Sequence, residues 1–420
     1  MASSSSSPSA GDEQEQDRRM ILAAANQVRR SHDDFFEDRD WDSMCTFWKW
    51  CLNAQDSLPA FVHGHQDEEA KGTEDSFGVT QFKMIQDSWV KQGLPLFEKH
   101  RYPDRVNFAL RIGYSGNSYS GYQKQKAGIG IHTVEDDLLD ALHGQKTNAA
   151  GRTDKDVSAV SQVINFHTRE KVTPEDIMSR AKQSDAVKSG NITIFECYNM
   201  PRRFHALFSA TWRRYIFLVP LNSQPSGKFD IDTDFVGLCL RKLENKSLHC
   251  NCFAAKETVE KDLCQIYRSD AIVVDVNSSN VFEKKVPAIC IELVGSRFLR
   301  NMVRVIVSTV VRESVRSPES DRNENILLDC CESGDRQMAA FPLNGKGLAL
   351  AGVGYSTNPP AAVPPGTKNS RQFVKDSCAS ASASEIQESS NKLSHRNLRL
   401  KRKAKLETTT EEVEKKTKCE

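Results

Sequence analysis

Cysteine pairs with metal-binding spacing are missing from this sequence, although it contains 12 cysteines. No Cys-x-x-Cys occurs, and the spacings Cys250-x-Cys252 and Cys330-Cys331 fit neither a zinc knuckle nor a small disulfide framework. We therefore expect reduced, scattered thiols and no metal site.

Nucleotide-binding and membrane-spanning signatures are missing as well. There is no P-loop, and the partial glycine pattern Gly128-x-Gly130 has Thr133 where a dinucleotide-binding loop needs a third glycine. No apolar run approaches the ~20 residues of a membrane helix. The serine-rich N-terminus turns acidic from Asp12 onward, which argues against a transit peptide. The sequence thus predicts neither a nucleotide cofactor nor a membrane span.

Charge is divided unevenly along the 420 residues, although the net charge is only +1. Residues 1–100 contain 10 Lys and Arg against 18 Asp and Glu, whereas residues 101–220 contain 17 against 12. The second segment is therefore the one suited to contact phosphate. At 38% hydrophobic residues the chain is polar for an enzyme, which predicts disordered ends. We expect disorder over residues 1–17, an acidic helical extension over 18–100, a globular core over 101–356, and a disordered Pro/Ser-rich and basic tail over 357–420.

Hydrophobic periodicity predicts alternating strands and helices in the core. Residues 106–114 are apolar at every second position, the pattern of a half-buried strand. Thr133 with Asp136 three residues on resembles a capping box and predicts the start of a helix. A helix is also expected over 297–314, with a basic stripe of Arg297, Arg300 and Arg304. Further strands are expected over residues 157–166, 212–219, 271–276, 288–294 and 348–355.

The N-terminal region from about residue 18 to residue 58 has a helical pattern. It contains four aromatic residues, which are Trp41, Phe47, Trp48 and Trp50. At helical spacing, such a group is more often a packing face than a ligand site. No activity is assigned to it.

The stretch Gly151-Arg-Thr-Asp-Lys-Asp-Val-Ser-Ala is the strongest candidate for chemistry. Small and polar residues before an apolar run predict a loop that leads into a strand. Asp154 stays ionised beside Arg152, because a nearby opposite charge favours the carboxylate, and a fixed carboxylate can act as a nucleophile or base. The alternative is a surface turn whose Asp only caps backbone groups. This stretch alone leaves both interpretations open.

Five segments, in the same order, resemble the TruA-type pseudouridine synthases, which isomerise uridine in transfer RNA. They are Tyr114-Ser-Gly with Gly121-Tyr-Gln-Lys-Gln, Gly151-Arg-Thr-Asp, Phe204-His-Ala with Phe208-Ser-Ala and Arg213-Arg-Tyr, Phe298-Leu-Arg-Asn-Met-Val-Arg, and Gly347-Leu. The resemblance implies an α+β fold of two similar ferredoxin-like halves, over residues 101–225 and 226–356. The halves would join into one long, mainly antiparallel sheet with helices on one face and a basic central cleft.

The resemblance also implies a role for each matching residue. Asp154 would be the catalytic nucleophile, and Arg304 would pair with it and hold it ionised. Tyr215 would stack on the flipped base, Arg152 would fill the space that the base leaves in the RNA, and Leu348 would line the uracil pocket. An isomerisation of this kind needs no redox or metal step, so no cofactor is implied.

The resemblance identifies transfer RNA as the partner and leaves the exact uridine open. Lys155 and Ser158 are similar to the eukaryotic branch that acts in or near the anticodon stem-loop. Family members are often dimers, so a homodimer is compatible with the sequence. The basic run 396–405 resembles a nuclear localisation signal, which predicts a location in the nucleus, the cytoplasm or both.

Two departures from the family pattern support a rival hypothesis. Asp156 stands where the family usually has Gly, and Leu207 stands where it commonly has Arg. An RNA-binding or tRNA-folding protein that kept the cleft and lost turnover would have this sequence. A third hypothesis is a scaffold that uses its N-terminal helices and its tail. If the protein is an enzyme, activity should survive removal of residues 1–95 and 357–420.

Overall fold

The computed structural model describes residues 39–54, 58–63, 81–96, 105–125, 130–221, 230–255, 262–277, 285–316 and 318–359. Met1–Asn358 forms one compact unit, which contains every element discussed below. Of the regions predicted to be disordered, residues 1–17 lie outside the described residues, and so does the tail 357–420 from residue 360 onward. So does the partial glycine pattern at Gly128.

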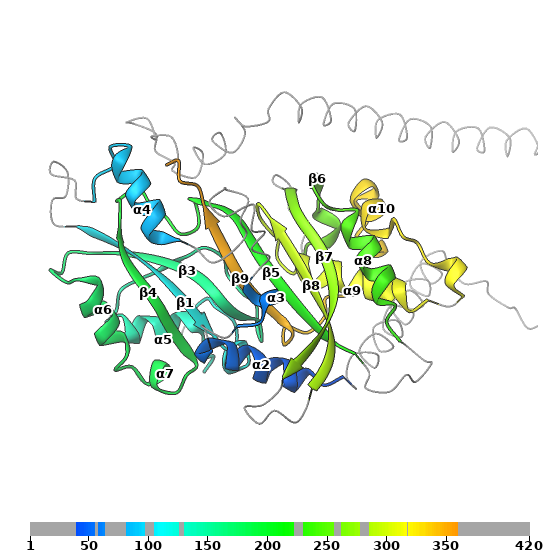
Figure 1. Cartoon of the computed structure of the whole chain (residues 1–420), viewed down its shortest axis with the longest axis horizontal. Helices are drawn as coiled ribbons and strands as arrows, with labels where there is room; N and C mark the ends of the chain where they lie inside the picture. Colours follow the sequence, from blue (N-terminus) through cyan, green and yellow to red (C-terminus); the bar gives the residue numbers. More distant parts are fainter. Residues whose placement is uncertain are drawn as a thin grey trace, which may run out of the picture. The chain divides into compact units, whose positions relative to one another are not determined.

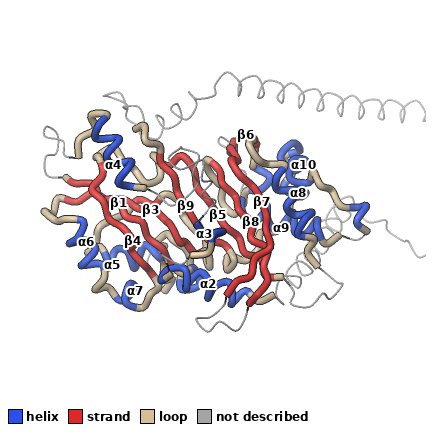
Figure 2. Tube along the Cα trace, in the orientation of Figure 1, coloured by secondary structure: helices blue, strands red, loops and turns tan. Residues whose placement is uncertain are grey.

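A single sheet of nine strands forms the centre of this unit (Figures 1 and 2). Its strands are β1 (Val106–Tyr114), β2 (Asn148–Ala149), β3 (Ser158–Thr168), β4 (Ile192–Met200), β5 (Ala210–Pro220), β6 (Lys246–His249), β7 (Leu263–Asn277), β8 (Lys285–Gly295) and β9 (Leu348–Tyr355). The described helices are α2 (Trp41–Asn53), α3 (Ala60–His63), α4 (Phe82–Lys91), α5 (Val134–Ala141), α6 (Pro174–Ala181), α7 (Asp185–Lys188), α8 (Thr233–Arg241), α9 (Met302–Ser314) and α10 (Ile326–Ser333).

The sheet consists of two halves with the same topology. In the first half, β1, α5, β2, β3, α6 with α7, and β4 follow one another, and the strands lie in the order β4-β1-β3-β2. In the second half, β5, α8, β7, β8, α9 and β9 come in the same succession, with β6 added between α8 and β7 and α10 added between α9 and β9, and the strands lie in the order β9-β5-β8-β7-β6. Both are βαββαβ units of the ferredoxin-like kind. The expected α+β fold with two similar halves is confirmed.

The two halves meet along one edge of β3. The far end of this strand pairs antiparallel with β2 at Ile164 and Asn165, whereas its first residues, Ser158 and Ala159, pair parallel with β9. All other strand pairs described in the sheet are antiparallel. The loop of residues 150–157 connects β2 to β3, so it lies at the junction of the halves.

Local sequence signals placed several elements correctly. The strands expected over 106–114 and 348–355 have those bounds. The Thr133 hydroxyl accepts a hydrogen bond from the Asp136 amide at the start of α5. The polar stretch of residues 173–190, for which no element was predicted, contains α6 and α7. Its missed signal is a capping box formed by Thr173 and Asp176.

The helix predicted over 297–314 was wrong at its start. The helix α9 begins only at Met302, because Asn301 has a left-handed backbone conformation with φ 64°. Arg297 and Arg300 therefore precede the helix, and the basic stripe along one helix face does not exist as predicted. Arg304 alone of the three lies on α9.

The N-terminal helices add a layer that the sequence did not predict. The α2 helix contacts strands of both halves, namely β1, β3 and β4 of the first and β5 and β7 of the second (Figure 1). Trp41, Phe47 and Trp48 are buried, which confirms the predicted aromatic packing face, and the Trp48 indole donates a hydrogen bond of 3.1 Å to the Gly347 carbonyl. Removal of residues 1–95 would take away part of the core, so activity is not expected to survive it.

None of the helices described here is long and apolar enough to cross a membrane.

Candidate active site

The loop between β2 and β3 presents the Asp154 carboxylate to two cations. One carboxylate oxygen lies 3.7 Å from Nε of Arg300, and the other lies 3.7 Å from Nη1 of Arg304. The Asp154 side chain is 31% exposed, so the carboxylate is both held and accessible. The predicted pairing of Asp154 with Arg304 is present, and Arg300 is a second partner that the sequence analysis did not assign.

Arg304 and Arg300 differ in how firmly they are held. Arg304 donates hydrogen bonds to the Leu343 carbonyl at 2.5 Å and to Oδ1 of Asn301 at 3.2 Å. Burial lowers the pKa of its guanidinium, and the nearby Asp154 and Asp156 carboxylates oppose this shift. The Arg300 side chain is 73% exposed. Arg304 is therefore a fixed charge beside Asp154, whereas Arg300 can turn towards a phosphate.

Backbone from two other parts of the chain closes around the Asp154 loop. A Cβ atom on Gly116 would lie 2.3 Å from the Val157 carbonyl carbon, and one on Gly345 would lie 2.4 Å from the Lys155 carbonyl oxygen. Gly121, with φ 115°, approaches the carbonyl of Thr153. The Gly116 amide also donates a hydrogen bond of 2.9 Å to the Ser158 hydroxyl. The loop is fixed by contacts that only glycine permits.

Tyr215 on β5 contributes an aromatic ring and a phenol to the same site. Its ring meets Phe298 edge to face, with centroids 5.2 Å apart. A methyl group on Gly151 would lie 3.6 Å from the Tyr215 hydroxyl oxygen, so this phenol lies beside the first residue of the Gly151-Arg-Thr-Asp motif. Burial raises the pKa of Tyr215 to about 12, with Arg213 opposing the shift and Asp154 adding to it. At neutral pH the phenol is protonated and can donate a hydrogen bond.

Comparison with known proteins shows a similarity that covers more than half of the chain. No protein-family model matches the chain. The chain is 29% identical over 255 residues to tRNA pseudouridine synthase A of Acetivibrio thermocellus, which covers 59% of this chain and 99% of the relative. It is 28% identical over 255 residues to the tRNA pseudouridine synthase A of Anoxybacillus flavithermus, with 58% and 96% covered. The chain is thus similar, over about three fifths of its length, to proteins named tRNA pseudouridine synthase A. Its assignment to the eukaryotic branch stays a prediction.

Two further residues predicted from the TruA resemblance occupy different surroundings. Arg152 is exposed on the loop, where its positive charge opposes the rise in pKa that burial causes at the Tyr122 phenol. Leu348 is buried and pairs with Phe217, two residues beyond Tyr215 on β5, whereas the β9 residue that pairs with Tyr215 is Leu350. The roles of Arg152 in the RNA and of Leu348 in a uracil pocket therefore stay predictions.

Asp156, the first departure from the TruA pattern, has a backbone conformation that favours glycine. Its φ of 65° lies in the left-handed region, which Asp tolerates better than most residues. The Asp156 carboxylate also acts to raise the pKa of Arg304 and of Lys346, so it contributes to the electrostatics of the site.

Substitutions at position 156 should separate backbone strain from charge. We expect Asp156→Gly to be as stable as wild type or more stable, by up to about 1 kcal/mol, because glycine adopts this φ without strain. Asp156→Val should lower the free energy of unfolding by about 1–3 kcal/mol, because a β-branched residue is strained there. Urea unfolding measures both effects. Equal stability of the valine variant and wild type would contradict the assigned loop conformation.

Leu207, the second departure, lies in a short loop that His205 organises. Leu207 is 42% exposed, and its amide, like that of Phe208, donates a hydrogen bond to Nδ1 of His205, at 3.2 and 3.4 Å. Nδ1 must therefore be unprotonated. Burial, with His167 nearby, lowers the pKa of His205 to about 4.

This loop should make stability depend on pH. Between pH 6.5 and about 4, the unfolded chain binds a proton at His205 that the folded protein does not bind. The contribution of neutral His205 to the free energy of unfolding is therefore fully present above pH 6.5 and is lost as the pH falls towards 4. His205→Asn keeps an acceptor that does not titrate, so the stability difference between wild type and this variant should change over that window. A difference that is constant from pH 7 to 4, measured by urea unfolding, would rule the effect out.

The ten cysteines within the described residues are free, but they are not scattered. Cys250 lies within side-chain hydrogen-bonding reach of Cys264 and Cys331, and Cys331 also reaches Cys252. All four are buried free thiols. Among the described residues, no group of three or more potential ligands has metal-binding geometry. The four cysteines pack in the core of the second half.

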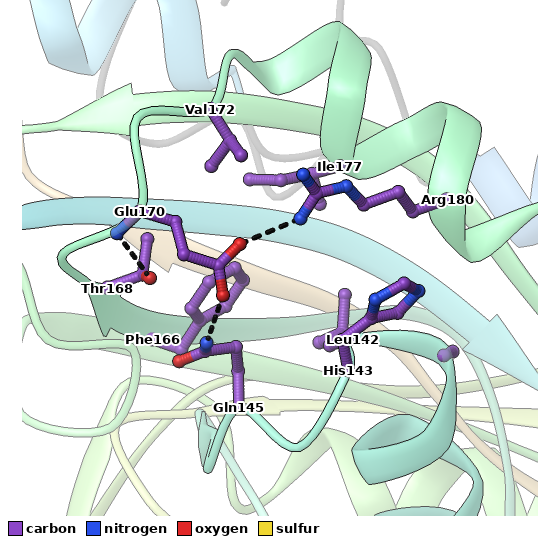
Figure 3. Close-up of a pocket in the computed structure, with 10 residues that line it drawn as sticks. Leu142, His143, Gln145, Phe166, Thr168, Glu170, Val172, Ile177 and Arg180 are labelled. Atoms are coloured by element: carbon purple, nitrogen blue, oxygen red, sulfur yellow. Dashed lines mark hydrogen bonds and ion pairs between the residues drawn. The ribbon is translucent and has the colours of Figure 1, made fainter.

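A separate shallow pocket lies in the first half, between the end of α5, β3 and α6 (Figure 3). The Glu170 carboxylate accepts hydrogen bonds there from Arg180 at 2.8 Å and from Gln145 at 3.2 Å. No residue of the Asp154 loop lines this pocket. It is not part of the candidate active site.

Proposed function

We propose that this protein is a tRNA pseudouridine synthase that uses Asp154 as its nucleophile. The observation that carries the proposal is the Asp154 carboxylate between Arg300 and Arg304, on a loop whose Gly151 adjoins the Tyr215 phenol. The similarity to relatives named tRNA pseudouridine synthase A supports transfer RNA as the substrate.

The geometry suits an isomerisation on a base that has left its stack. A uridine must be flipped out before a side chain can reach it, and an aromatic ring can hold its face. The Asp154 carboxylate would attack the uracil or the ribose while the bond from N1 to C1′ breaks. The freed uracil turns, C5 bonds to C1′, and the bond to the Asp154 carboxylate breaks. C5 then loses its proton, and N1, which had none while it was bonded to C1′, takes one up. Atoms and electrons balance without a co-reactant.

The arginines of the site and Tyr215 have different proposed roles. Arg304, fixed by Leu343 and Asn301, places a positive charge beside the Asp154 carboxylate and orients it. Arg300 and Arg152 are exposed and suited to contact the RNA backbone around the flipped nucleotide. Tyr215 stays protonated and offers its ring and its hydroxyl to the base.

The anticodon stem-loop is the target region that we propose within transfer RNA. Of the two residues behind this prediction, Lys155 is exposed and available to RNA, whereas Ser158 is buried and accepts the Gly116 amide. The proposal therefore depends on Lys155. A homodimer, and a location in the nucleus, the cytoplasm or both, are part of the same proposal.

The test is incubation of the full-length protein with a pool of unmodified transfer RNA, followed by mapping of pseudouridine at each position. The proposal expects pseudouridine in or beside the anticodon stem-loop. Binding of the pool with salt-sensitive affinity, but without any product, would instead support an RNA-binding protein without turnover. Product at a distant position would keep the activity and overturn the assigned region.

A further inference from the structure

Two adjacent arginines on β5, Arg213 and Arg214, are both buried, at 9% and 1% exposure. Successive residues of a strand point to opposite faces of the sheet. The two guanidinium groups accordingly reach different parts of the molecule.

Arg213 reaches the face that carries the Asp154 loop. Its guanidinium donates to the Ala150 carbonyl from Nε at 3.3 Å and from Nη2 at 3.1 Å. It also donates to the Ser296 carbonyl at 2.8 Å and to the Leu207 carbonyl at 3.0 Å. These carbonyls belong to three segments that are far apart in the sequence.

Two of the three segments carry part of the candidate active site. Ala150 directly precedes the loop with Arg152 and Asp154, and Ser296 directly precedes the segment that leads to Arg300 and Arg304. Leu207 lies in the exposed loop that follows His205. One rigid, planar side chain thus fixes the start of the nucleophile's loop relative to the start of the segment that provides its cations.

We propose that Arg213 is a positioning residue that sets the distance between the Asp154 carboxylate and its two arginine partners. This inference rests on the proposed pseudouridine synthase activity. Arg213 would not touch the substrate, and it would act through the backbone of the two segments. A lysine cannot replace it, because its donors all lie on one nitrogen and cannot span carbonyls in several directions.

Arg214 provides a matched control on the opposite face. It donates to the Phe61 carbonyl at 2.7 Å and to the Val62 carbonyl at 2.6 Å, both on α3, and it pairs with Glu292. Arg214 is therefore buried and hydrogen-bonded to backbone carbonyls, as Arg213 is. Its bonds hold the N-terminal helix α3 against β5 and do not reach the active site. Loss of its contacts should affect stability without moving Asp154.

The experiment compares Arg213→Lys with Arg214→Lys in the full chain. We expect Arg213→Lys to lower kcat about a hundredfold with KM changed little, because a displacement of about 1 Å in a catalytic group has that effect. Arg214→Lys should lower the melting temperature and leave kcat close to wild type. Hydrogen exchange should become faster in residues 150–157 and 296–301 only in Arg213→Lys, and in residues 60–63 only in Arg214→Lys.

The outcomes separate this inference from the proposed function. An active wild type together with unchanged kcat and unchanged exchange in Arg213→Lys would overturn the inference alone. A wild type without product would overturn the proposed function, and hydrogen exchange would still decide whether Arg213 fixes the two segments. If Arg213→Lys failed to fold while Arg214→Lys folded, Arg213 would be a residue of the core and not a positioning residue.

Discussion

Replacing Asp154 by Asn should reduce pseudouridine formation roughly 10⁴- to 10⁶-fold, the range seen when a nucleophile is removed from an enzyme. The asparagine side chain has nearly the same shape, but its amide cannot attack as a carboxylate does. The two ion pairs that are lost have separations of 3.7 Å, and one of them involves a largely exposed arginine. Such pairs contribute little to stability, so the variant should fold and bind transfer RNA.

Asp156→Asn is the matched control for this variant. It removes a carboxylate from the same loop, two residues away, and asparagine also tolerates the left-handed conformation with φ 65°. Activity should stay within a few-fold of wild type, measured as pseudouridine formed under single-turnover conditions. Equal losses in both variants would mean that the loop needs negative charge in general and that Asp154 is not the nucleophile.

The substitution Gly116→Ala should have the second-largest effect on activity. Its Cβ would lie 2.3 Å from the Val157 carbonyl carbon and 2.5 Å from the carbonyl carbon and oxygen of Asp156, all of them backbone atoms. The loop must move to admit it, which should cost about 1–3 kcal/mol of stability. Because Asp154 moves with the loop, we also expect about a hundredfold loss of kcat.

Gly237→Ala provides the comparison for Gly116→Ala. Gly237 lies on α8, and an added Cβ would approach only the end of the flexible Arg241 side chain, at 2.9 Å. Alanine should stabilise this helix by up to about 1 kcal/mol and leave activity unchanged. Thermal unfolding and single-turnover rates of both variants test the argument. A Gly116→Ala variant with wild-type activity would show that the loop tolerates displacement.

The sequence predicted the parts of the fold that depend on local patterns. Alternation of apolar residues identified β1 and β9, and a short capping motif identified the start of α5. Asp154 and Arg304 were found because each belongs to a short motif of the family. Signals of this kind lie within a few residues of one another, so they are visible without the structure.

Contacts between distant segments were not predictable in this way. Gly345 supports the Asp154 loop from almost two hundred residues away, and nothing in its local sequence indicates the close backbone approach. The strand pattern showed that Arg213 and Arg214 alternate, but it could not show that both sides of β5 are covered. The left-handed Asn301 that delays the start of α9 also leaves no periodic signal.

The acidic N-terminal extension shows the same limit. Its aromatic residues were correctly interpreted as a packing face, but their partner was unknown, and the extension was treated as removable. Trp48 is buried and bonds to Gly347 beside the first residue of β9, the strand that pairs with β3 at the junction of the halves. The described part of the extension therefore belongs to the same core as the active site.

The most direct test of the central claim is release of the C5 hydrogen from uridine in transfer RNA labelled there with tritium. Formation of the bond from C5 to C1′ requires that this hydrogen leave. Wild-type protein should release tritium in proportion to the pseudouridine formed, and Asp154→Asn should release none above background. Release by both proteins at similar rates would contradict the assignment of Asp154 as the nucleophile. Release by neither protein would contradict the proposed pseudouridine synthase activity.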